Sequence, residues 1–143
     1  MIKKPKLTSP KMDFGKKITP VHATEDNLQM LVYGRPGTGK TTIAASFPKP
    51  ILLLDIREQG TDSVRDIEGL DVAYIDDWTE FEGALWHLKK GEGVKYKTVI
   101  IDSISMAQQV AMNEVLHKTG QSSIDRQGWG EVSGMLNQVI YGF

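Results

Sequence analysis

A glycine-rich loop carries the most specific chemical signal in this sequence. It fits the pattern G-x-x-x-x-G-K-T, and with the threonine that follows its residues are Gly34, Arg35, Pro36, Gly37, Thr38, Gly39, Lys40, Thr41 and Thr42. Glycines allow backbone torsions that side chains block, so consecutive N–H groups can point at one anion. A lysine at this place reaches β- and γ-phosphates, and a threonine hydroxyl binds Mg²⁺. We therefore predict a nucleotide-phosphate site, with Lys40 as its catalytic cation and Thr41 as a metal ligand.

A carboxylate that follows a run of strand-forming residues is the second expected part of this site. The run is Thr98–Ile101, and Asp102 comes directly after it. Many strands end in aspartate by chance, but a phosphate-binding loop of this type needs an acid at the tip of a neighbouring strand. We predict that Asp102 holds Mg²⁺ through a coordinated water.

The residue that activates an attacking water is indicated less sharply. Asp55, Glu58 and Asp77 all lie at or just beyond the ends of expected strands. Parallel strands place their carboxyl ends on the ligand side of a sheet, so each of the three could reach the phosphates. We favour Glu58 as the catalytic group, with Asp55 as the second choice. The alternative is that these are solvated acids in loops.

Strand and helix patterns alternate along the chain and give the frame for these residues. Short apolar runs predict strands at Leu28–Tyr33, Ile51–Leu54, Val72–Ile75 and Thr98–Ile101. Helices are expected at Thr41–Phe47, from a Thr79/Glu82 capping box to Lys90, at about Ser105–Lys118, and after a loop at Gln121–Gly130. This alternation predicts a three-layer α/β domain with a mainly parallel sheet.

Composition narrows the class of protein. The chain has 143 residues, of which 40% are hydrophobic and 24% charged, and this size suits one domain. The absence of cysteine excludes disulfides, thiolate zinc sites and cysteine nucleophiles. A membrane-spanning helix needs about 20 apolar residues, and the longest apolar runs are only of strand length. We expect no membrane segment, no secretory signal and a cytoplasmic protein.

The first 27 residues differ from the rest in charge and pattern. Residues 1–17 contain six lysines and one acid, a charge of +5, whereas the remaining residues carry −6. Three prolines and few large apolar side chains predict a flexible basic arm at 1–27. Its lysines are either a solubilising leader, which we favour, or contacts to nucleic-acid phosphates.

The motifs together resemble those of the RecA-like ATPases. The residues that carry the resemblance are Tyr33–Thr42 (YGRPGTGKTT), Leu52–Asp55 (LLLD), Tyr96–Ile104 (YKTVIIDSI) and the pair Trp129-Gly130. The chain is most similar to phage-encoded nucleotide-binding proteins of the minimal single-strand-annealing recombinase type. The resemblance implies ATP and Mg²⁺ as cofactors, single-stranded DNA and further copies of the chain as partners, and the cytoplasm of an infected bacterium as the location.

Two departures from the RecA pattern affect these expectations. The position of the RecA glutamate is taken by Arg57, so Glu58 requires a loop shifted by one residue. The strand that follows the second motif in RecA-like proteins is not in the sequence, so we expect 28–143 to be the N-terminal part of a longer ATP-binding domain. We also expect that strand Leu28–Tyr33 does not pair directly with Thr98–Ile101.

Two other functions use the same phosphate-binding loop. A small nucleoside or metabolite kinase usually adds an arginine-rich lid, and the four arginines here do not cluster. A nucleotide-binding module without turnover is the second alternative. An assay of phosphate release against phosphate transfer separates the three.

Overall fold

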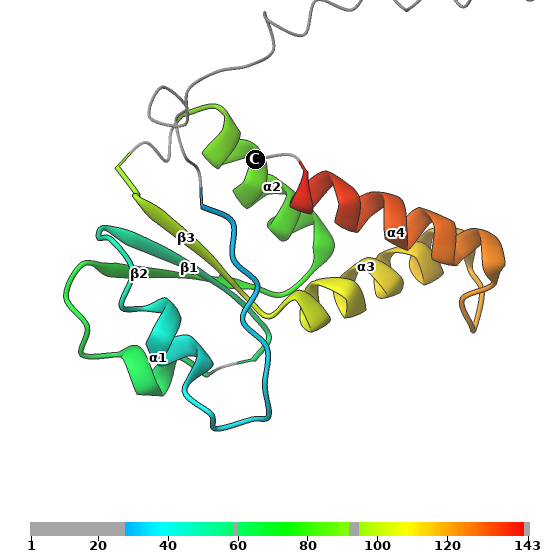
Figure 1. Ribbon diagram of the computed structural model, residues 1–143. Helices are drawn as coiled ribbons and strands as arrows, with labels where there is room; N and C mark the ends of the chain where they lie inside the picture. The colour runs from blue at the N-terminus through cyan, green and yellow to red at the C-terminus, as the bar shows by residue number, and fades with distance from the viewer. Residues whose placement is uncertain (1–27, 59, 92–94, 142–143) are drawn as a thin grey trace, which may run out of the picture. The chain divides into compact units, whose positions relative to one another are not determined.

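The computed structural model of the chain describes residues 28–58, 60–91 and 95–141 (Figure 1). The chain divides into two units, residues 1–32 and 33–143, and every described helix and strand belongs to the second. The basic arm predicted at 1–27 lies outside the described residues.

In the described part of the chain, three parallel strands form a sheet in the order β2-β1-β3. They are β1 (Ile51–Ile56), β2 (Leu70–Ile75) and β3 (Thr98–Asp102). All residues of β1 are buried, as expected for a continuous apolar strand in the middle of a covered parallel sheet. The register places Asp55 of β1 beside Asp102 of β3. Two predicted site residues therefore share the carboxyl edge of the sheet.

Helices cover both faces of the sheet, which confirms the predicted three-layer α/β fold (Figure 1). Leu52, Leu54 and Ile56 of β1 face the larger core, with α2 (Trp78–Lys89), α3 (Ile104–Thr119) and α4 (Arg126–Ile140). Leu53 faces a smaller core beside α1 (Lys40–Ala44) and the 3-10 helix η3 (Gly60–Val64). The alternation along β1 explains why one strand serves two cores.

The prediction of a strand at Leu28–Tyr33 is wrong. The segment has no regular secondary structure, and Leu28 and Leu31 are each 74% exposed. An apolar run becomes a strand only when a neighbouring backbone accepts its hydrogen bonds. Among the described residues of unit 33–143, β3 pairs with β1.

The start of α2 differs from the predicted capping box. The predicted pair was Thr79 and Glu82, but the N-cap is Asp77, whose Oδ1 accepts a hydrogen bond from the Glu80 N–H at 2.9 Å. Glu80 in turn accepts from the backbone N–H of Asp76 at 2.8 Å. The helix therefore begins two residues earlier than predicted, with Asp77 as its cap and with the Glu80 side chain bonded to the residue before that cap.

Two other helices have boundaries that differ from the predicted ones. Helix α1 ends at Ala44 rather than Phe47, because the backbone N–H groups of Ser46 and Phe47 donate to carbonyls three residues back and tighten the last turn.

Helix α4 begins at Arg126, inside the loop predicted at 121–130, so Trp129 and Gly130 are helical. The residue that indicates this start is Asp125, the N-cap of α4, whose Oδ1 accepts a hydrogen bond from the Gly128 N–H at 2.7 Å. This backbone hydrogen bond, with the Gln121 side chain, holds the pKa of Asp125 below its ordinary value.

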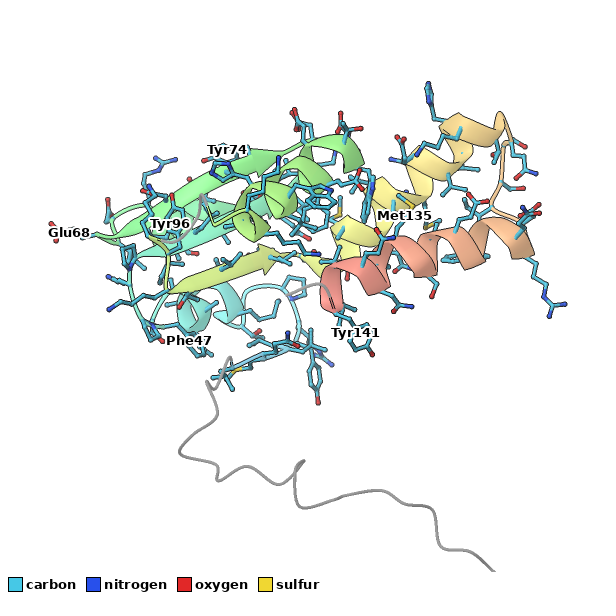
Figure 2. The ribbon with its side chains drawn as sticks, turned by 90° about the horizontal axis from the view of Figure 1, so that it is seen from above. Phe47, Glu68, Tyr74, Tyr96, Met135 and Tyr141 are labelled. Carbon is cyan, nitrogen blue, oxygen red and sulfur yellow. The ribbon has the colours of Figure 1, made fainter. Side chains whose placement is uncertain are left out.

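Helix α4 runs back along α3 (Figure 1). Met135 of α4, labelled in Figure 2, packs against the larger core. Gly128 permits the close approach at the far end of the pair, since a Cβ there would lie 3.4 Å from Val115 Cγ1 and 3.2 Å from Ile124 Cγ2. Within the described residues, no helix combines the length and the apolar character needed to cross a membrane.

Candidate functional site

The loop before α1 has the backbone conformation that its glycines predicted. Gly37 and Gly39 have φ values of 77° and 80°, a region that residues with a side chain adopt only at a cost. Gly39 is the N-cap of α1, and no side chain caps the helix there. Thr38 closes the turn by donating from Oγ1 to the Arg35 carbonyl at 2.8 Å. The first N–H groups of α1 therefore stay available to an anion at the loop.

Lys40 turns back over this loop. Its Nζ donates to the carbonyl oxygens of Gly34 at 3.1 Å and Arg35 at 3.0 Å. The ammonium group is thus held beside the backbone that would surround a phosphate. Phosphate oxygens are stronger acceptors for an ammonium group than these carbonyls, because they are charged.

Thr41 and Asp102 come together from distant parts of the sequence. Thr41 Oγ1, in the first turn of α1, donates to Asp102 Oδ2, at the end of β3, at 2.7 Å. These two hard oxygens fit Mg²⁺, which keeps several waters and takes few protein ligands beside substrate phosphates. The described residues contain no group of three or more His, Asp or Glu side chains arranged to hold a metal alone.

The chain after β1 makes a turn that directs Glu58 toward the same edge of the sheet. Arg57 adopts φ 58°, and the Glu58 N–H then donates to Asp55 Oδ1 at 3.1 Å. Glu58 Oε1 accepts a hydrogen bond from Ser103 Oγ at 2.8 Å. The left-handed turn at Arg57 therefore brings the Glu58 carboxylate to the start of α3, where Ser103 lies.

The three acids considered for water activation have different surroundings. Glu58 is exposed and lies beside Ser103, the residue after Asp102. Asp55 is 2% exposed and holds the turn through its Oδ1. Asp77 caps α2 after β2, which β1 separates from β3. Only Glu58 combines an exposed carboxylate with a contact to the residue next to Asp102.

Ser103 is the one member of this arrangement that the sequence analysis did not single out as a site residue. It lies in the run Tyr96–Ile104, which the sequence analysis used only for the family resemblance. A serine between a strand and a helix is also a common N-cap, and Ser103 is the N-cap of α3.

We expect Asp102→Asn to weaken the response to Mg²⁺ while nucleotide contact is kept. The amide preserves the shape of the carboxylate but removes its charge, so the Mg²⁺ concentration for half-maximal hydrolysis should rise at least about 10-fold. A Mg²⁺ titration of phosphate release at saturating ATP measures this. The control is Asp62→Asn, which removes a carboxylate from an exposed ion pair with Arg65. An unchanged Mg²⁺ requirement in Asp102→Asn contradicts the metal role.

Comparison with known proteins identifies the family of this chain. The family model described as an AAA domain matches residues 26–141. No curated protein and no solved structure matches the chain. The matched region contains the glycine-rich loop, Lys40, Glu58 and Asp102, and it covers most of the sequence. This chain therefore belongs to the AAA domain family, and its α/β fold is that of a nucleotide-binding P-loop NTPase.

Proposed function

We propose that this domain binds ATP with Mg²⁺ and hydrolyses it, and that it acts as a RecA-like protein on single-stranded DNA in phage recombination or repair. The observation that supports hydrolysis is that two hydrogen-bonded pairs of side chains lie next to each other at the carboxyl edge of the sheet. Thr41 contacts Asp102, and Glu58 contacts the adjacent Ser103. A metal-binding pair thus lies next to a carboxylate suited to accept a proton.

Each of these residues has a distinct part in the reaction. The loop N–H groups and Lys40 bind the β- and γ-phosphates and stabilise the charge that develops on them. Thr41 and Asp102 would hold Mg²⁺, and this ion would supply positive charge to the phosphates. Glu58 orients the attacking water and accepts its proton as the water oxygen bonds to the γ-phosphorus. The bond from the γ-phosphorus to the bridging oxygen breaks, and ADP leaves with that electron pair.

Two sequence features support the DNA part of the proposal. The first is the resemblance to RecA-like proteins, which rests on Tyr33–Thr42, Leu52–Asp55, Tyr96–Ile104 and the Trp129-Gly130 pair. Residues 1–17 carry +5, the sign that binds nucleic-acid phosphates, although the rest of the chain carries −6. Contacts through the backbone phosphates would make this binding independent of base sequence.

The test is to measure phosphate release from ATP with and without single-stranded DNA, beside transfer of phosphate to nucleosides. The proposal expects Mg²⁺-dependent release that DNA changes in rate, and no transfer. Transfer to a nucleoside would identify a kinase instead. Nucleotide binding without release would identify a binding module.

We expect replacement of the six lysines of residues 1–17 by glutamine to lower affinity for single-stranded DNA. The change removes the positive arm and leaves an acidic chain. If all six lysines contact phosphates, the salt slope of the binding constant should flatten by about 4. Titrations of a labelled oligonucleotide at several salt concentrations measure both quantities. Replacement by arginine is the matched control and should keep both; if the glutamine variant also keeps both, the lysines form only a leader.

A further inference from the structure

We propose that Ser103 is a positioning residue for Glu58, and that its hydroxyl fixes one oxygen of the Glu58 carboxylate while the other accepts the proton of the attacking water. This inference rests on the hydrolysis proposed above. The observation behind it is the hydrogen bond from Ser103 Oγ to Glu58 Oε1 at 2.8 Å, between the turn after β1 and the start of α3.

The direction of this hydrogen bond follows from a second contact of the same hydroxyl. Ser103 is the N-cap of α3, and its Oγ lies 3.3 Å from the Met106 backbone nitrogen. A backbone N–H can only donate, so Ser103 Oγ accepts there. A hydroxyl has one hydrogen, which is then free to point to Glu58. Capping of α3 therefore sets the orientation of the donor.

Glu58 is held at a second point through its backbone. Its N–H donates to Oδ1 of Asp55, whose side chain is fixed by burial at 2% exposure. The left-handed turn at Arg57 brings the backbone to this position. An exposed glutamate without such contacts samples many rotamers. With the backbone and Oε1 both held, Oε2 is the oxygen that we assign to the water.

A group that only orients another affects the chemical step rather than substrate binding. The side-chain hydrogen bonds of Ser103 in the described residues are to Glu58 and Met106, and its carbonyl accepts from the Ala107 N–H within α3. Loss of its hydroxyl would leave Lys40, Thr41 and Asp102 in place, so ATP binding should be kept. The expected signature is a lower kcat with an unchanged KM.

The experiment compares Ser103 variants of the full chain in steady-state ATP hydrolysis. We expect Ser103→Ala to lower kcat about 10-fold with KM for ATP within about twofold, and Ser103→Thr to restore most of kcat. In a Glu58→Gln background, Ser103→Ala should have no further effect, because a residue that acts through Glu58 has nothing left to position. A full additional 10-fold loss in that background would overturn the proposal.

Two further variants separate positioning from helix capping. Ser103→Gly removes the hydroxyl with little loss of capping, since glycine is itself an acceptable N-cap, and it should lower kcat as Ser103→Ala does. Asp125→Ala removes the N-cap of α4 instead, and it should lower Tm by a few degrees without lowering kcat. If Asp125→Ala lowers kcat as much, or if Ser103→Gly retains full kcat, the proposal fails.

The outcomes also distinguish this proposal from the function on which it rests. Hydrolysis by the parent chain together with a Ser103→Ala variant of equal kcat overturns the role of Ser103 and leaves the ATPase standing. A parent chain that binds ATP but releases no phosphate overturns both.

Discussion

Lys40→Ala is expected to lower kcat/KM for ATP at least about 100-fold and to leave the fold intact. The ammonium group lies over the glycine-rich loop, within 3.1 Å of two loop carbonyls, where it would meet the β- and γ-phosphates. It contributes nothing to either hydrophobic core. The loss should therefore appear in nucleotide binding and turnover, measured by titration calorimetry and phosphate release, while the circular dichroism spectrum stays that of the parent.

Lys118→Ala is the matched control for this change. Lys118 forms an exposed ion pair with Glu114 at 3.0 Å on α3, far along the chain from the loop. Removal of such a pair costs at most a few tenths of a kcal/mol and should not change ATP turnover. A Lys40→Ala variant that hydrolyses ATP like the Lys118→Ala control would show that the loop is not the phosphate site.

Glu58→Gln should reduce kcat by about 100- to 10,000-fold and leave KM for ATP within about threefold. The amide has the shape of the carboxylate, and its carbonyl oxygen can still accept from Ser103, so the turn after β1 should be preserved. What is lost is the ability to take a proton from water. Single-turnover hydrolysis measures this step apart from product release.

Glu68→Gln serves as the control, because Glu68 precedes β2 at the opposite end of the strands, as Figure 2 shows. It should hydrolyse ATP like the parent. The same experiment tests the second choice from the sequence, Asp55, since a Glu58→Gln variant with full kcat would point to another base. Burial of Asp55 makes that outcome unexpected.

The conformation of the glycine-rich loop could be predicted from the residues of the loop alone. Its function depends on torsions at Gly37 and Gly39 and on a lysine and threonine directly after them, all within a few residues. Such features are set by sterics of neighbouring residues, so they can be read from the sequence alone. The same is true of the run Ile51–Leu54, which predicted a strand of a parallel sheet covered on both faces and which lies within β1.

Other features depended on partners that are distant in the sequence. The pattern of Leu28–Tyr33 is as apolar as that of β1, but a strand also needs a backbone to pair with, and no local pattern reports one. The cap of α2 was misplaced by two residues because Thr79 and Asp77 are both good N-caps, and the end of β2 decides between them.

The sequence by itself determined the conformation of the glycine-rich loop and the class of fold, because these follow from local sterics and hydrophobic pattern. Only the tertiary structure decided that Thr41 and Asp102 touch, and that Glu58 rather than Asp55 or Asp77 lies beside Ser103. The physical reason is register: parallel pairing of β1 with β3 sets Asp55 opposite Asp102, and the left-handed turn at Arg57 then carries Glu58 to the start of α3.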